Sequence, residues 1–193
     1  MHRFMEKMAY FLAGLGGLVL SFLILMTCAS IAGRIINSIL HSDLLQGVMP
    51  DVASTLLATG VGPINGDFEL VEAGLAFVIF TFIPLCQLDN GHASVDIFIS
   101  RFPVLNKRIQ VFIDIIFAAT LVLIAYKLFS GMQSKQNSGQ TTLLLQFPVW
   151  WAYAASLFGA VAAALVGVYI AIVRLLETFT GKQILSIEGG AEH

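Results

Sequence analysis

The residues best placed to do chemistry in this chain are carboxylates that lie in or beside long apolar runs, because a charge at membrane depth is costly and commonly functional. Glu69 and Glu72 stand at the start of one such run, and Asp114 lies near the start of another. A carboxylate at the start of a helix interacts favourably with its positive end. Glu69 and Glu72 could instead contact a basic residue of a partner subunit, and both interpretations remain open.

Asp114 needs a partner if it is buried. Lys107 and Arg108 precede it on the same predicted helix, and a pairing across helices is the other possibility. A proton or ion relay normally needs several acids along a path. One acid gives little support to that chemistry.

Two further polar or aromatic segments could form structural or subunit-interface motifs. Gly91 could end a helix as a C-cap, and His92 and Asp96, four residues apart, would share one side of a following helical turn. A solvated capping loop would explain this segment equally well. Pro148 suits the first turn of a helix, and Trp150 and Trp151 are typical of the aromatic belt of a membrane protein.

The chain lacks the motifs of an enzyme or a metal centre. It contains no HExxH, GxSxG or glycine-rich phosphate loop, and its histidines lie outside the apolar runs. Cys28 and Cys86 lie within apolar runs without metal-ligand spacing. The sequence therefore predicts no enzymatic activity and no catalytic, cofactor or metal site on this chain.

The elements that carry these residues are membrane spans. Of 193 residues, 58% are hydrophobic and 11% are charged, and the mean hydropathy is +0.87, which excludes a water-soluble enzyme, a disordered tail and a secreted disulfide scaffold. The net charge of -2 makes nucleic acid an unsuitable partner. Because a membrane helix needs about 20 apolar residues, we predict an all-α integral membrane protein. It forms a single domain, 1–193, with four transmembrane helices at about 8–33, 69–88, 109–129 and 148–173.

The segments between the spans differ in length and character. The connection 34–68 is too long for a simple turn, and its apolar residues recur at helical spacing. It is predicted to lie in the membrane interface as an additional amphipathic helix, to extend the first span, or to project into the periplasm. Residues 130–142 are predicted to form an exposed loop. Lys and Arg gather near the N-terminus, between the second and third spans and in the tail 174–193, so both termini are expected in the cytoplasm.

The order of several motifs resembles one transporter family. The motifs are Phe68-Glu69-Leu70-Val71-Glu72, Gly91-His92 with Val95-Asp96, Phe102-Pro103, and Pro148-Val149-Trp150-Trp151-Ala152-Tyr153. Together they resemble the small membrane subunit, the DctQ-like component, of tripartite ATP-independent periplasmic (TRAP) transporters. The resemblance covers about 67–167.

The resemblance implies an accessory role in a bacterial inner membrane. In this family the small subunit scaffolds a large multi-spanning permease subunit, which is expected to hold the substrate and sodium sites. A periplasmic binding protein delivers an organic acid, and a sodium gradient drives its uptake. Membrane lipids are the remaining partners, and His92 and Asp96 are expected to order a cytoplasmic loop or to meet the large subunit.

Two other functions remain open on the sequence. One is a self-sufficient oligomeric four-helix exporter, in which Asp114 would be the shared acid. The other is a structural tetraspan protein or assembly factor without a transport role.

Overall fold

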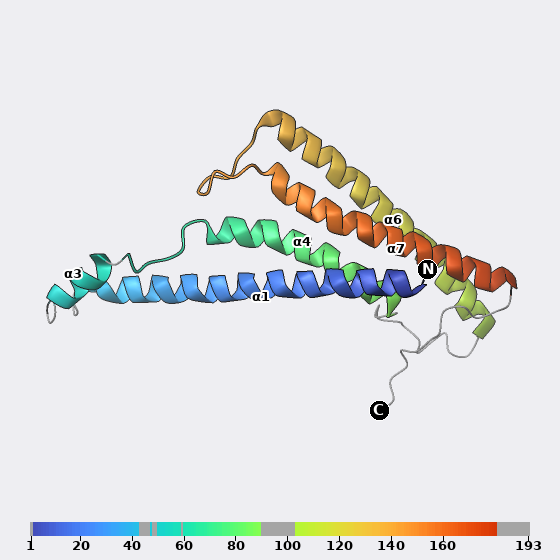
Figure 1. Ribbon diagram of the computed structural model, residues 1–193, viewed down its shortest axis with the longest axis horizontal. Coiled ribbons are helices and arrows are strands. Elements are labelled where there is room, and N and C mark those ends of the chain that lie inside the picture. Colours follow the sequence, from blue (N-terminus) through green and yellow to red (C-terminus); the bar gives the residue numbers. More distant parts are fainter. Residues whose placement is uncertain (1, 43–46, 48–49, 59, 90–102, 181–193) are drawn as a thin grey trace, which may run out of the picture.

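The chain is built from helices. The computed structural model describes residues 2–42, 47, 50–58, 60–89 and 103–180. The helices are α1 (His2–Leu40), α3 (Pro50–Ala58), α4 (Asp67–Leu88), α6 (Pro103–Ser138) and α7 (Trp150–Thr180) (Figure 1). Four of them, α1, α4, α6 and α7, are long and apolar enough to cross a membrane, which confirms the predicted all-α fold with four membrane helices.

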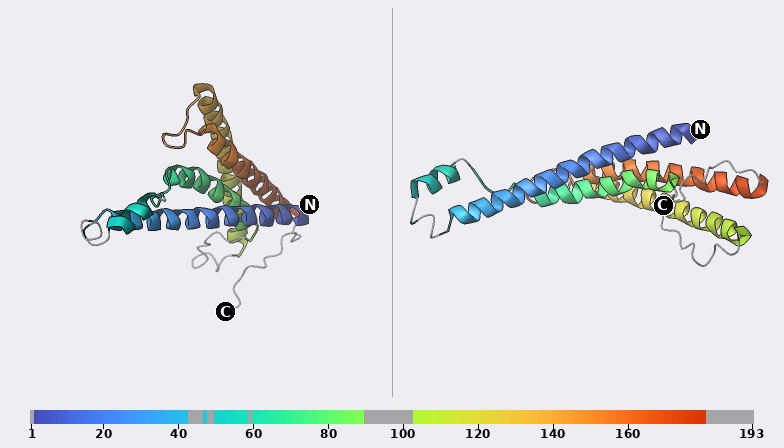
Figure 2. Two further views of the ribbon diagram at one scale, coloured as in Figure 1. Left: turned by 60° about the vertical axis from the view of Figure 1, so that its left-hand side comes forward. Right: turned by 90° about the horizontal axis from the view of Figure 1, so that it is seen from below.

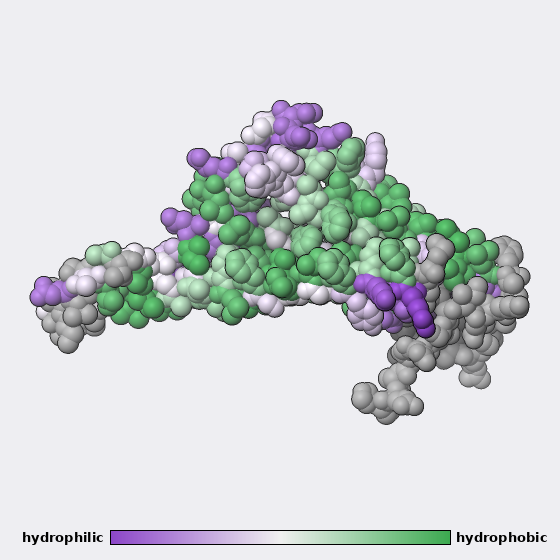
Figure 3. All heavy atoms as spheres, in the orientation of Figure 1, coloured by the Kyte–Doolittle hydropathy of each residue, from purple (hydrophilic) through white to green (hydrophobic). Residues whose placement is uncertain are grey.

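Helix formation follows from the apolar runs, because a backbone inside a bilayer must satisfy its own hydrogen bonds. The 22 residues of α4 extend about 33 Å at 1.5 Å per residue, close to the ~30 Å thickness of the hydrocarbon layer. The other three helices have 39, 36 and 31 residues, so they tilt or extend beyond that layer. Apolar side chains cover much of the outer surface of these helices (Figure 3).

The membrane helices form two antiparallel pairs rather than a closed bundle. The main contacts join α1 to α4, α4 to α7, and α7 to α6, so the packing order is α1–α4–α7–α6. Figures 1 and 2 show α1 beside α4, and α6 beside α7 at an inclination to the first pair. The starts of α4 and α7 lie at one end of the molecule, which we call the α4-start end. The start of α6 and the end of α7 lie at the opposite end.

Small residues allow these helices to approach closely, as is common in membranes. A Cβ added at Gly16 of α1 would lie 2.3 Å from Thr81 Oγ1 of α4, and one at Gly159 of α7 would lie 2.9 Å from the Cβ of Phe80. Ala160 and Ala163 of α7 are completely buried. The small residues of α7 therefore place it at the centre of the packing order.

Some helix boundaries differ from the sequence predictions. The predicted loop 130–142 is wrong over its first part, because α6 continues to Ser138 and ends before Gly139, which has a positive φ of 61°. Polar residues there continue the helix into a solvated end, where Lys135 Nζ donates to Gln140 Oε1 at 2.6 Å. Similarly α1 continues to Leu40, so residues 34–40 extend the first helix, and α3 is a separate short helix in the connection.

Candidate functional site

The first turns of α4 carry three carboxylates with different surroundings. The helix begins after Gly66, a residue with φ 79° that offers no side-chain cap. Asp67, Glu69 and Glu72 follow within two turns. Sequence analysis singled out Glu69 and Glu72 and missed Asp67.

Asp67 ties α4 to α1. Ser30 Oγ of α1 donates to Asp67 Oδ2 at 2.5 Å, and the backbone N–H of Phe68 donates to Asp67 Oδ1 at 2.7 Å. Arg34 Nη2 lies 3.9 Å from Asp67 Oδ2. Ser30 is completely buried, so its hydroxyl depends on partners within the protein.

The same contact holds the chain that enters α4. The N–H of Ile64 donates to Ser30 Oγ at 3.2 Å. A Cβ added at Gly33 would lie 2.2 Å from the carbonyl oxygen of Gly62, so only glycine permits this approach. We call Ser30, Gly33 and Asp67 the α1 clasp.

Glu69 ties α4 to the segment that precedes α7. The N–H groups of Leu144 and Leu145 donate to Glu69 Oε1 and Oε2 at 2.8 and 3.0 Å. This segment, residues 140–149, is called the strap. It closes on itself because Thr142 N–H donates to the Phe147 carbonyl and Val149 N–H donates to the Gln140 carbonyl, each at 3.0 Å.

The strap is apolar at its tip. Leu143 is 92% exposed and Leu144 is 66% exposed, while Leu145 packs onto Gly66, where a Cβ would lie 2.4 Å from Leu145 Cγ. Backbone N–H groups outside a helix are tolerated near a membrane only when they have partners. The carboxylate of Glu69 supplies two such partners from within this chain.

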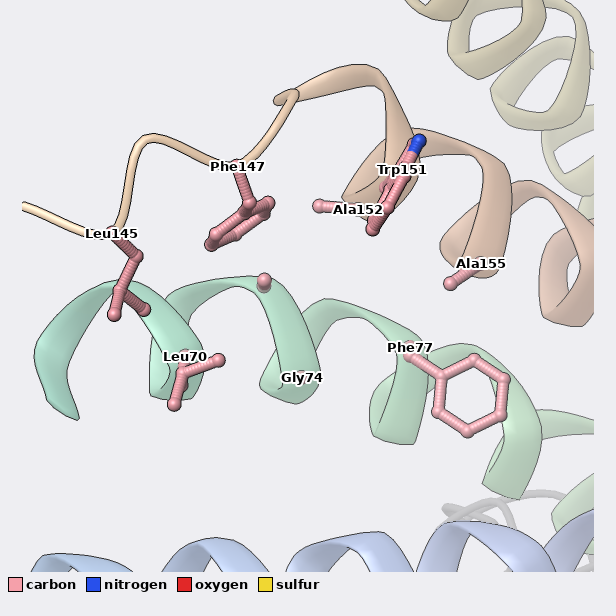
Figure 4. Close-up of a pocket in the computed structure, with 9 residues that line it drawn as sticks. Leu70, Gly74, Phe77, Leu145, Phe147, Trp151, Ala152 and Ala155 are labelled. Carbon is pink, nitrogen blue, oxygen red and sulfur yellow. The ribbon is translucent and has the colours of Figure 1, made fainter. Parts of the chain in front are cut away.

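A groove lies under the strap, between α4 and α7 (Figure 4). Its volume is about 510 Å³, and its lining is apolar: Leu70, Ala73, Gly74, Phe77, Leu145, Phe147, Trp151, Ala152 and Ala155. Trp151 meets Trp150 edge to face, with ring centroids 6.1 Å apart. Pro148 precedes α7, which begins at Trp150. The lining carries no titratable side chain, so the groove is suited to apolar contact.

Glu72 lies one turn after Glu69 on α4, about 60° around the helix from it. It is exposed, and in the part of the chain that the structure describes it has no hydrogen bond or ion pair. Phe68, Leu75 and Ile79 are also exposed and share its side of the helix. We call Phe68, Glu72, Leu75 and Ile79 the outer face of α4.

At the opposite end of the molecule, Asp114 pairs across helices. Its Oδ2 lies 2.9 Å from Arg174 Nη1 of α7, and the two side chains are 20% and 14% exposed respectively. Asp114 therefore pairs across helices, which is one of the two possibilities that the sequence left open. Its partner, Arg174, was not a candidate at that point. Arg174 belongs to α7, which continues to Thr180.

Other predicted site residues are not brought together. Gly91, His92 and Asp96 lie outside the described residues, so their predicted roles remain predictions. The helix α4 ends at Leu88, before Gly91, with Asp89 at its C-cap. Among the described residues, no group of three or more His, Cys, Asp or Glu side chains is placed to hold a metal ion.

Comparison with known proteins gives one match. A family model described as the DctQ component of tripartite ATP-independent periplasmic transporters matches residues 23–178, from the middle of α1 almost to the end of α7. No curated protein and no solved structure matches the chain.

Proposed function

We propose, because this chain belongs to the DctQ family of tripartite ATP-independent periplasmic (TRAP) transporters, that it is an accessory subunit which scaffolds a large permease subunit. The family match over most of the chain is the observation that carries the proposal. The family is a transporter component and not an enzyme family, and four apolar helices make the chain a multi-pass membrane protein.

The architecture supports a scaffolding role. The helices pack in the open order α1–α4–α7–α6, so α1 and α6 each have one main helical neighbour. Large apolar side chains remain exposed along both, including Phe22 and Leu25 of α1 and Phe112 and Leu123 of α6. Helices with such apolar surfaces remain in contact with the membrane or with another membrane protein, so the chain can enlarge the membrane-embedded part of a larger complex.

The transport chemistry is proposed to lie elsewhere in the complex. We expect a periplasmic binding protein to deliver an organic acid, and a sodium gradient to drive its uptake through the large subunit. The sodium ion would bind to that subunit and not to this chain. The distribution of Lys and Arg supports an inner-membrane orientation with both termini in the cytoplasm.

The geometry of Asp114 favours this role over a self-sufficient exporter. An oligomeric exporter would need a membrane-embedded acid shared between copies. Here the Asp114 carboxylate pairs with Arg174 of its own chain at 2.9 Å.

The test is co-purification from native membranes in a gentle detergent with a C-terminal tag on this chain. A large polytopic protein should be recovered with it, and deletion of this chain should abolish sodium-gradient-driven uptake of the solute. Recovery of this chain alone as a stable oligomer, with uptake unaffected by the deletion, would contradict the proposal.

A further inference from the structure

We infer that the outer face of α4 contacts a transmembrane helix of the large permease subunit, with Glu72 pairing there with a Lys or Arg of that subunit. This inference rests on the proposed function and adds the surface and the chemistry of the contact. It starts from the carboxylate near the membrane boundary for which the described residues provide no partner.

The four residues of the outer face form one continuous stripe. Phe68, Glu72, Leu75 and Ile79 are spaced by four, three and four residues, which places them on one side of a helix. Phe68 is 74% exposed, and Leu75 and Ile79 are also exposed. The stripe is therefore apolar apart from a single negative charge.

The opposite side of α4 is already occupied within this chain. A Cβ added at Gly74 would lie 2.8 Å from Leu23 Cδ1 of α1, and Phe77 lines the groove beneath the strap. The α1 and α7 contacts of α4 thus lie away from Glu72. A partner can reach the outer face without displacing either helix.

The depth of Glu72 makes an unpaired charge unfavourable. The uncharged stretch from Ala73 to Leu88 is about 24 Å long as a helix, which is shorter than the ~30 Å hydrocarbon layer. When Asp89 lies at one boundary of the hydrocarbon layer, Glu72 therefore lies within the layer, near its opposite boundary. A carboxylate there requires a partner of opposite charge, or it must draw water and headgroups inward.

Three other carboxylates of the chain have partners within the protein. Asp67 accepts from Ser30 and Phe68, Glu69 accepts from two strap N–H groups, and Asp114 pairs with Arg174. Glu72 is one turn from Glu69 and faces outward. Charge complementarity then selects a protein partner with a basic side chain set in an apolar helix.

The experiment measures recovery of the large subunit with tagged variants of the full chain, purified from native membranes. Glu72→Lys should reduce recovery by at least about tenfold, because it places two positive charges together. Glu72→Gln should reduce recovery less. A Lys or Arg of the large subunit changed to Glu should restore recovery with Glu72→Lys.

Steric variants keep the test informative if Glu72→Lys fails to insert. Ile79→Trp should reduce recovery of the large subunit by crowding the same face. Ile172→Trp is the matched control on α7, because Ile172 and Ile79 are both 52% exposed. The control should leave recovery unchanged.

The outcomes separate this inference from the proposed function. If the wild-type chain recovers the large subunit and the Glu72 and Ile79 variants recover it equally well, the outer face contacts lipid and the inference is wrong, while the proposed function stands. If wild-type chain recovers only differently tagged copies of itself, both are wrong.

Discussion

The two ends of the helical array are held together by different chemistry. At the α4-start end, Asp67 and Glu69 accept hydrogen bonds from a hydroxyl and from backbone N–H groups. At the opposite end, Asp114 forms an ion pair with Arg174, joining one helix directly to another. The first arrangement joins α4 to α1 and also fixes non-helical chain against helices, whereas the second joins α6 to α7 through opposite charges.

This difference determines what a substitution leaves behind. Removing one member of a mostly buried ion pair leaves a charge without compensation. Removing the Glu69 carboxylate at the α4-start end leaves the neutral N–H groups of Leu144 and Leu145, whose residues are exposed and can bond to water at the membrane boundary. We therefore expect global effects at the Asp114–Arg174 end and more local effects at the α4-start end.

The largest effect is expected for Arg174→Leu. The side chains of Asp114 and Arg174 are 20% and 14% exposed, so the substitution removes the ion pair of a largely buried carboxylate and should destabilise the protein by about 3–5 kcal/mol. Denaturant unfolding in detergent micelles measures the change. The double variant Asp114→Leu with Arg174→Leu should recover most of the stability. Equal destabilisation by the single and double variants would show that packing, and not charge, holds this end.

Sequence analysis could predict the helices but not most of these contacts. The apolar runs require four membrane helices because the bilayer imposes internal hydrogen bonding, and the structure has them. The partners of Glu69 are the N–H groups of Leu144 and Leu145, which carry no side-chain signature and lie 75 and 76 residues away. No local pattern identifies such a pairing.

Two other residues show where a signal existed and was missed. Asp67 directly follows Asn65-Gly66, at the predicted start of a helix, and it could have been considered with Glu69 and Glu72. Gln87 is 6% exposed, and its Nε2 would lie 3.0 Å from a Cβ added at Gly167 of α7. The sequence shows that Gln87 is a polar residue within an apolar span. That it lies opposite Gly167 can be seen only from the packing of α4 on α7.

The second largest effect is expected for Gly33→Val in the α1 clasp. Any Cβ there would lie 2.2 Å from the carbonyl oxygen of Gly62, and a backbone atom cannot move aside as a side-chain end can. The chain that enters α4 must shift, at a cost of about 1–3 kcal/mol. Unfolding in micelles measures this cost, with Gly14→Val as the control because a Cβ at Gly14 meets nothing within 4 Å. If Gly33→Val lowered the free energy of unfolding as much as Arg174→Leu does, the two ends would not differ in how far a substitution destabilises the protein.

A smaller effect is expected for Ser30→Ala. The buried hydroxyl of Ser30 donates to Asp67 and accepts from the N–H of Ile64, so its removal should cost about 1 kcal/mol. The exchange of the Ile64 amide hydrogen should become faster, whereas that of the Leu144 amide should stay unchanged. Faster exchange at both amides would mean that the α1 clasp and the strap open as one unit.

The smallest effect on global stability is expected for Glu69→Gln, because its consequence is confined to the strap. It therefore tests whether effects at the α4-start end are local. The Leu144 and Leu145 N–H groups each donate to a different oxygen of Glu69, and Gln replaces one of these oxygens with an NH₂ group, which faces a donor instead of accepting from it. Amide exchange at Leu144 and Leu145 should become several-fold faster, while the unfolding midpoint in micelles stays close to that of the wild type. Glu72→Gln is the matched control one turn along the same helix, and it should leave strap exchange unaltered because no hydrogen bond joins Glu72 to the described residues of the strap. Loosening of the strap by both variants would indicate that the charge of the α4-start end, rather than the direct contact of Glu69, holds the strap in place.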